Sequence, residues 1–302
     1  MIRVAYFGLP LGALLLAEDG LPPSLVVLSP IDAPGRRRLA RRLEAPILDA
    51  RESSVSELSS AIDVAVARAA PELVVSWYFT RRIEERWLGA ARLGGVGAHP
   101  SLLPRHRGPN PFFAAIDAGD RTTGVSVHRL TAAYDEGDVL ATEEIPIGDR
   151  DAWQLARALD RPSLRLLRRV VRDVAHGVEP AATRQDDARA TWAPEPSGDS
   201  LRADFGWSTE RVLRRIRALS PVPGLAIELR GVPLFVTRAE SALEYPFALH
   251  PGEAAIADDV VIRTGDGAIR VTRAAVPDDA TGDALVLNGE ELVLRVQGPP
   301  QR

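Results

Sequence analysis

The stretch of sequence that decides the fold is IRVAYFGLPLGALLL, residues 2–16. Its apolar run over residues 2–7 is typical of a strand that is buried on both faces, as in a parallel sheet. The glycine and proline at 8–10 predict a turn, and the apolar residues beyond them predict a helix through residue 16. A strand followed by a tight turn and a helix is the repeating unit of an α/β protein.

The same alternation continues through the first half of the chain. Short apolar runs predict further strands, and apolar residues at positions i, i+3 and i+4 predict amphipathic helices between them. This order favours a doubly wound, mainly parallel, Rossmann-like sheet with helices on both faces. The predicted strands cover residues 24–28, 73–76, the neighbourhood of 96, 125–130 and 139–147, and the predicted helices cover 53–70, 81–88, 112–118 and 150–177.

A change of composition marks the second half of the chain. Residues 179–204 are rich in Pro, Ala, Asp, Ser and Gly, which is typical of a linker between domains. Beyond them we expect a helix at 209–219 and short strands separated by turns, a pattern typical of a small, OB-like β-barrel. Those strands are expected at 225–229, 234–239, 254–257, 260–264, 268–273 and 285–296. The predicted division is an α/β domain at 1–185, a linker at 186–204 and a barrel domain at 205–302.

The composition excludes several classes of chemistry. All 37 basic residues are arginine, so neither a lysine Schiff base nor a P-loop lysine is available. The chain has no cysteine, and its five histidines lack the spacing of metal ligands, so we expect no metal site. No apolar run approaches about 18 residues, the length that spans a bilayer. A formal net charge of −4 gives no general attraction to nucleic acid or to an anionic membrane, so no membrane partner is expected. We expect the chain to be cytoplasmic.

A dinucleotide site is not expected, because the turn after the first strand lacks the G-x-G-x-x-G pattern. The informative segment is instead GGVGAHPSLLPRHRGPNP, residues 94–111. His99 comes just past the end of a predicted strand, at the edge where open α/β sheets bind their ligands. Asp135 lies in a predicted turn, and a carboxylate near an imidazole favours the charged form of that imidazole. From position alone, both a structural and an acid–base role stay open for this pair.

Longer motifs point to a family. HPSLLP at 99–104, TGVSVH at 123–128 and YDEGD at 134–138 resemble the folate-dependent formyltransferases. That family includes enzymes acting on methionyl-tRNA, on glycinamide ribonucleotide and on amino sugars or amino acids. The second half is similar to the linker and C-terminal barrel of the tRNA enzymes, in ATWAP at 190–194, DFGWS at 204–208 and RALSPVPG at 217–224. The resemblance therefore covers nearly the whole chain.

The resemblance implies a catalytic set in the order Asn-x-His, then Asp, with His99 and Asp135 in the last two places. It also implies 10-formyltetrahydrofolate as the donor, an amine as the nucleophile, and an oxyanion held by the Asn amide and the imidazolium. This chain departs from the pattern, since Gly97 stands where the family has Asn. Losing one oxyanion donor typically costs about 2.7–4 kcal/mol of transition-state stabilisation.

Asn110 is the first candidate for a substitute donor, although it is equally suited to cap the helix that follows it. Gly97 also opens volume, so a different one-carbon donor such as S-adenosylmethionine stays open. The other residues expected to line the donor and substrate pocket are Ser101, Leu102, Leu103, Pro104, Gly108, Tyr78, His128 and Asp138.

For the acceptor, the sequence favours a small amine over tRNA. Residues 201–302 carry 12 arginines against 14 acidic residues, which is a poor surface for a polyanion. Pro100 and the run RGPNP at 107–111 look more like family members that act on amino sugars or amino acids. The arginine cluster at 36–42 lies where tRNA enzymes carry a basic loop, but it is equally well explained as an exposed helix face. A tRNA formyltransferase and a relative that no longer transfers formyl groups stay open as alternatives.

Overall fold

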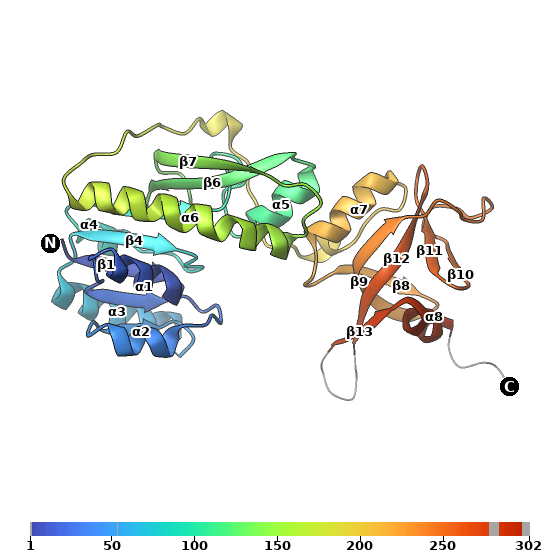
Figure 1. The fold of residues 1–302 in the computed structure, drawn as a ribbon, viewed down its shortest axis with the longest axis horizontal. Coiled ribbons are helices and arrows are strands. Elements are labelled where there is room, and N and C mark those ends of the chain that lie inside the picture. Colours follow the sequence, from blue (N-terminus) through green and yellow to red (C-terminus); the bar gives the residue numbers. More distant parts are fainter. Residues whose placement is uncertain (1, 53, 278–283, 298–302) are drawn as a thin grey trace. The chain divides into compact units, whose positions relative to one another are not determined.

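The computed structural model describes residues 2–52, 54–277 and 284–297. By its internal contacts the chain divides into two compact units (Figure 1). Unit 1 comprises Met1–Pro111, Thr123–Pro146 and Ala158–Ala193, and unit 2 comprises Phe112–Thr122, Ile147–Arg157 and Pro194–Arg302. The domain boundaries predicted from composition stay a prediction.

Unit 1 is built on a seven-stranded sheet with the order β3-β2-β1-β4-β5-β6-β7. The pairs among β1 to β5 are all parallel, and β6 runs antiparallel to β5. The expected mainly parallel, doubly wound sheet is therefore confirmed. The strands are β1 (Val4–Gly8), β2 (Leu25–Leu28), β3 (Ile47–Asp49), β4 (Leu73–Trp77), β5 (Gly95–His99), β6 (Thr122–Arg129) and β7 (Val139–Pro146).

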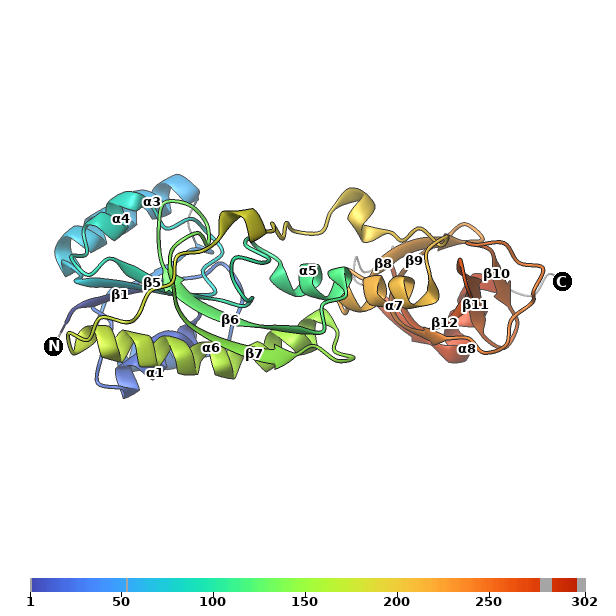
Figure 2. The ribbon, with the colours of Figure 1, turned by 90° about the horizontal axis from the view of Figure 1, so that it is seen from above.

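Helices cover both faces of this sheet: α3 and α4 lie on one side, and α1 and α6 on the other (Figure 2). Helix α1 begins with Pro10 in its first turn, where the missing N–H costs nothing. Helix α3 begins with a capping box between Ser54 and Glu57. The arginine cluster forms α2, so its interpretation as a helix is confirmed. The first six helices of the chain are α1 (Pro10–Glu18), α2 (Arg36–Arg42), α3 (Val55–Ala69), α4 (Glu85–Gly89), α5 (Pro111–Ala118) and α6 (Ala152–Ala175). Nearly all of α5 and the beginning of α6 belong to unit 2.

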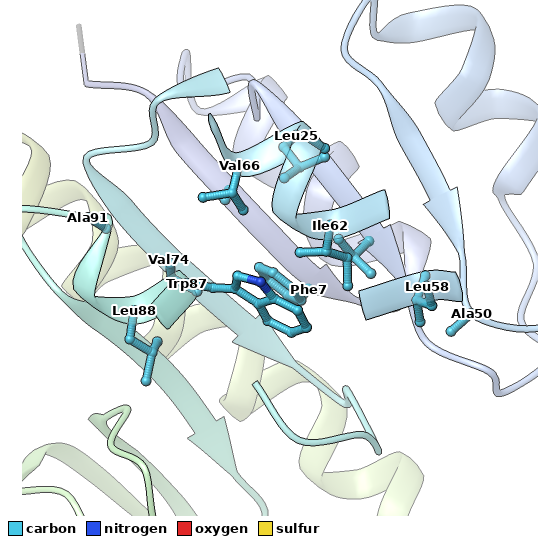
Figure 3. Close-up of a cluster of buried hydrophobic side chains, with 13 residues drawn as sticks. Phe7, Leu25, Ala50, Leu58, Ile62, Val66, Val74, Trp87, Leu88 and Ala91 are labelled. Carbon is cyan, nitrogen blue, oxygen red and sulfur yellow. The ribbon is translucent and has the colours of Figure 1, made fainter. Parts of the chain in front are cut away.

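An apolar cluster fills the space between the sheet and helices α3 and α4 (Figure 3). Phe7 from β1 stacks on Trp87 from α4, with ring centroids 5.9 Å apart. Ile62 and Val66 reach the same cluster from one face of α3 and are buried. Each such side chain contributes about 1.5–3 kcal/mol through burial, so this cluster fixes the helices on the sheet.

Unit 2 contains a six-stranded antiparallel sheet with the order β10-β11-β12-β9-β8, and β13 pairs with β12. The sheet curls into a half-barrel, which agrees with the barrel expected from the sequence. Its strands are β8 (Leu225–Leu229), β9 (Val232–Ser241), β10 (Ala254–Ile256), β11 (Val260–Arg263), β12 (Ala268–Pro277) and β13 (Ala284–Asn288). Its sheet is accompanied by α7 (Thr209–Ala218) and α8 (Gly289–Gln297). Short 3₁₀ turns cover Asp187–Arg189 in unit 1 and Gly198–Leu201 in unit 2.

The prediction of strands throughout 285–296 is wrong in its second part. Only β13 is extended, and the chain then forms α8, in which Leu292, Val293 and Val296 are buried. Their spacing is that of one helix face. The sequence does not separate this face from the apolar strand that directly precedes it.

Within the described residues, no helix combines the length and the hydropathy needed to cross a bilayer. The same part of the chain holds no cluster of three or more His, Cys, Asp or Glu side chains suited to a metal ion.

Candidate functional site

The site predicted from the motifs lies at one edge of the sheet of unit 1. His99 is the last residue of β5, and Tyr78 directly follows β4, the parallel neighbour of β5. Both residues therefore stand at the carboxyl ends of adjacent parallel strands, where open α/β sheets bind ligands. The sequence placed His99 at this edge correctly.

The structure brings His99 and Asp135 together. His99 Nδ1 lies 3.4 Å from Asp135 Oδ2, and the His99 ring is only 6% exposed. The other ring nitrogen, Nε2, donates to the backbone carbonyl of His106 at 2.8 Å. Asp135 is held in the left-handed backbone region at φ 57°, and its Oδ2 accepts from the Gly108 N–H at 2.9 Å. A protonated His99 thus has a fixed carboxylate partner.

A second histidine contacts the same carboxylate. His128 Nε2 lies 3.6 Å from Asp135 Oδ1, the oxygen that does not face His99. Its Nδ1 is 2.9 Å from the Arg129 carbonyl, and its side chain is 4% exposed. Burial lowers the pKa of His128, with nearby Asp135 acting against this and His99 adding to it. Asp135 therefore bridges two imidazoles.

Gly97 lies on the same face of β5 as His99, opposite His128 in the antiparallel register. A Cβ atom at Gly97 would approach Leu130 Cδ2 to 2.7 Å, and the His128 Nε2 would lie 3.6 Å from it. The space beside Gly97 is thus filled from β6 and the residue after it. The sequence prediction of open volume at this position is wrong for that reason.

The loop of residues 100–111 is held by hydroxyl groups. Ser101 Oγ donates to the Arg105 carbonyl at 2.6 Å. Ser126 Oγ donates to the Ser101 carbonyl at 2.8 Å and accepts from the Leu103 N–H at 3.0 Å. Ser126 therefore fixes the loop from β6, and the predicted pocket residues Leu102, Leu103 and Pro104 lie within this ordered loop.

The segment of residues 185–193, predicted to be the end of a domain and the start of a linker, also holds the site. Gln185 Nε2 donates to the carbonyls of Asp135 and Gly137, both at 2.7 Å. Its Oε1 accepts from Arg107 at 3.1 Å and 2.8 Å. Gln185 thereby joins the turn that carries Asp135 to the loop that follows His99. Gln185 and Arg107 were not predicted as site residues. Gln185 lies 50 residues from Asp135 and 78 from Arg107, and no local sequence pattern indicates contacts at such separations.

The neighbouring residues of this segment run beside the same loop. The N–H of His106 donates to Thr191 Oγ1 at 2.8 Å. The N–H of Ala193 donates to the Arg107 carbonyl at 2.7 Å, and the N–H of Asn110 donates to the Ala193 carbonyl at 3.0 Å. Residues 185–193 thus act as a strap across the loop. The role of the Asn110 side chain as a substitute donor stays a prediction.

Two other predicted pocket residues have neighbours of their own. Burial of Tyr78 raises its pKa, and the nearby Asp160 carboxylate raises it further. The backbone carbonyl of Asp138 accepts from the Arg129 N–H at 2.9 Å, which ties the Asp135 turn to β6. The structure therefore places Tyr78 next to α6 and Asp138 at the end of the turn.

A separate hollow of about 540 Å³ lies on the α3 and α4 side of the sheet. Phe79, Trp87 and Ile62 form its apolar wall, and Arg81 and Arg82 lie at its polar side. It shares no residue with the predicted catalytic set.

A parallel sheet with a histidine–carboxylate pair at its carboxyl edge, joined to a second unit of antiparallel strands, defines a two-unit α/β enzyme. The chain belongs to the formyl transferase family of enzymes: residues 23–171 match the formyl transferase family, and residues 199–289 match its C-terminal domain. The family resemblance seen in the motifs is thereby confirmed.

A relative agrees with this assignment, and solved structures share the fold. The methionyl-tRNA formyltransferase of Ralstonia nicotianae is 32% identical over 303 residues, which cover 91% of each chain. HypX from Aquifex aeolicus in complex with tetrahydrofolic acid matches with a TM-score of 0.64 at 21% identity, over 98% of this chain and 47% of HypX. This chain therefore spans about half the length of HypX.

An N-formyltransferase from Helicobacter canadensis, solved with folinic acid and dTDP-3-aminofucose, matches with a TM-score of 0.65. It is 14% identical, over 90% of this chain and 99% of that one. At such identities the two solved structures show the fold alone.

Proposed function

We propose that this protein transfers a formyl group from 10-formyltetrahydrofolate to an amine. The observation that carries the proposal is the buried His99–Asp135 pair at the end of β5, with Nδ1 and Oδ2 3.4 Å apart, in a chain of the formyl transferase family. An imidazole backed by a carboxylate can carry a positive charge next to an oxygen that becomes negative. Transfer of a formyl group from one nitrogen to another places negative charge on the formyl oxygen, and a positive charge beside that oxygen stabilises the transition state.

The donor would supply a formyl group bound to nitrogen, and the reaction exchanges that nitrogen for the nitrogen of the acceptor. A bond forms between the acceptor nitrogen and the formyl carbon, the donor C–N bond breaks, and one proton passes from the acceptor to the departing nitrogen. His99 would stabilise the charge on the formyl oxygen, and Asp135 would hold His99 in place. Residues 185–193 would keep both groups fixed through Gln185 and Arg107.

A folate donor is supported by the solved structures that resemble this chain, since HypX was solved with tetrahydrofolic acid and the Helicobacter enzyme with folinic acid. The residues present suit such a donor, because a buried imidazole–carboxylate pair fits an amide-like formyl group. S-adenosylmethionine has no comparable support and becomes an outcome of the binding test.

Two acceptors are each favoured by an observation. Methionyl-tRNA is favoured by the relative from Ralstonia, whose similarity extends through 91% of both chains. A small amine, such as an amino sugar or amino acid derivative, is favoured by the excess of acidic residues over arginine in 201–302. The preference for a small amine drawn from the sequence is not confirmed, and we place methionyl-tRNA first. A cytoplasmic location also stays a prediction.

The experiment is a formyl transfer assay with 10-formyltetrahydrofolate and either methionyl-tRNA or a panel of amino sugars and amino acid esters. With methionyl-tRNA as substrate, we expect formyl-methionyl-tRNA and a KM that rises steeply with salt, because phosphate contacts are screened. Turnover of a small amine with a salt-independent KM would move the assignment to the second acceptor. Absence of transfer to every acceptor would refute the proposed function.

A further inference from the structure

The inference concerns His128, the residue opposite Gly97 on the neighbouring strand β6. In the family pattern a polar side chain stands two residues before the catalytic histidine, and here that residue is Gly97. His128 is its direct partner across the β5–β6 pair. Leu130 Cδ2 lies 2.7 Å from the Cβ position of Gly97, and the His128 Nε2 lies 3.6 Å from that position and 3.6 Å from Asp135 Oδ1. The polar atom beside the catalytic pair therefore comes from β6 rather than from β5.

The hydrogen bond at the other ring nitrogen fixes the tautomer of His128. The Arg129 carbonyl can only accept, so the Nδ1 that lies 2.9 Å from it carries the proton. In the neutral ring Nε2 is then an unprotonated acceptor. An asparagine amide would donate a hydrogen bond at this place, whereas the His128 Nε2 can take up a proton.

We propose that His128 is the proton acceptor of the site: its Nε2, seated beside Gly97 and Asp135, takes the proton of the attacking amine. The inference rests on the proposed function and adds a role for a residue that the family pattern leaves unassigned here. When the acceptor nitrogen bonds to the formyl carbon, it loses one proton to Nε2. The resulting imidazolium faces Asp135 Oδ1, and the proton then passes to the nitrogen of the departing folate, so the ring is neutral again.

The surroundings suit this cycle. The charged or titratable groups around His128 are Asp135 from the turn, His99 from β5 and Arg107 from the loop. Burial lowers the pKa of His128, which keeps the ring neutral and ready to accept a proton near neutral pH. The neutral His128 ring has no proton on Nε2 to donate to Asp135, so the two groups form an ion pair only after Nε2 has taken up a proton. Both ring nitrogens of His99 already have partners, Asp135 and the His106 carbonyl. His99 would therefore act on the formyl oxygen through its charge alone, while His128 takes up the proton.

The first test compares His128→Asn with His128→Gln. The asparagine amide can keep the hydrogen bond from the Nδ1 position to Arg129, and the glutamine amide places a polar group near the Nε2 position. Neither can accept a proton. General base catalysis contributes about 10²–10⁴-fold, so we expect both variants to lose about 100-fold in kcat, with KM for the acceptor little changed. We also expect both to lose the acid limb of the pH profile of kcat/KM.

His176→Asn is the matched control. Its Nδ1 bonds to the Arg172 carbonyl at 2.7 Å in the same manner, but His176 is exposed and follows the last residue of α6. It should be as active as the wild type. Free imidazole added to His128→Ala should restore part of the rate, in proportion to its neutral fraction.

A second readout does not depend on turnover. In the wild-type protein labelled with ¹⁵N in histidine, we expect the His128 resonances of a neutral ring protonated at Nδ1 at pH 7. A ring protonated at Nε2, or a charged ring at that pH, would overturn the proposal.

The outcomes separate this inference from the proposed function. If the wild type transfers formyl groups and His128→Asn or His128→Gln retains its rate within about threefold, the base role is refuted and the proposed function stands. If the wild type shows no transfer to any acceptor, the proposed function fails and the base role fails with it.

Discussion

Two regions of unit 1 bury their side chains equally well and for different reasons. The cluster around Phe7 and Trp87 is apolar, and its members need only the right volume and shape to exclude water. The network around Asp135 is polar, and each oxygen of that carboxylate has its own partner, His99 on one side and His128 on the other. The first region tolerates exchange of similar side chains, whereas in the second each atom has a defined place.

The difference shows where stability and function reside. Apolar burial holds α3 and α4 on the sheet without specifying any chemistry. The polar network contributes less to stability, because hydrogen bonds in the protein replace hydrogen bonds to water, at a net gain of about 0.5–1.5 kcal/mol each. The role that we assign to this polar network is to hold the imidazoles of His99 and His128 around the carboxylate of Asp135.

The largest effect on stability is expected from the apolar region. Phe7→Ala removes a ring that is fully buried and stacks on Trp87. It should lower the free energy of unfolding by about 3–5 kcal/mol, measured by urea denaturation. Val55→Ala, at a position that is 71% exposed, serves as the control. A loss below about 1 kcal/mol for Phe7→Ala would mean that this cluster does not organise the unit.

The largest effect on activity is expected at His99. His99→Asn should lower kcat/KM for formyl transfer by about 10²–10³-fold, because the charged partner of the formyl oxygen is lost. The same variant should change the free energy of unfolding by less than Phe7→Ala does. Retention of full turnover would show that the buried pair is structural.

Gln185 tests whether the strap positions the site. Gln185→Ala removes the side chain that donates to the carbonyls of Asp135 and Gly137. It also removes one partner of Arg107, which keeps its ion pair with Asp187. We expect a loss of about 1–3 kcal/mol in stability. We also expect a decrease in kcat/KM of about tenfold, because misplacing a catalytic group by about 1 Å can cost up to about 10²-fold in rate. Gln297→Ala, on α8, is the control. A stable Gln185→Ala variant with unchanged kcat/KM would show that the Asp135 turn needs no strap.

The smallest expected effect is that of pH on the free energy of unfolding. Because burial lowers the pKa of His128 below its value in the unfolded chain, the unfolded chain binds more protons in acid than the folded protein does. Stability should therefore fall as the pH drops from 7 through the unfolded pKa of about 6.5. Urea denaturation at pH 7, 6 and 5 should show a shallower fall for His128→Asn than for the wild type. Equal slopes would place the His128 ring in a more solvated environment.

The sequence predicted the apolar region better than the polar one. Regular spacing of apolar residues marked β1, α3 and β4, because burial imposes a period on the sequence. The strand β3 has three residues and none of them is fully buried, so its sequence shows no apolar pattern from which a strand could be predicted. The helix α8 was mistaken for a strand, since it follows β13 without a break.

Only some residues of the polar site could be predicted from the sequence. His99 and Asp135 were found through motifs and through the place of His99 at a strand end. Gln185 gave no signal, because its partners lie 48 to 78 residues away in the sequence. The contact of His128 with Gly97 follows from the register of β5 and β6, which is set by tertiary pairing rather than by the residues of either strand.

The most direct test of the account is calorimetric binding of folinic acid, with S-adenosylmethionine and the variant His99→Ala measured alongside. We predict micromolar binding of folinic acid to one site per chain, weakened in His99→Ala, and no heat from S-adenosylmethionine. Absence of folate binding, above all together with binding of S-adenosylmethionine, would contradict formyl transfer and show that the fold has been kept for a different reaction.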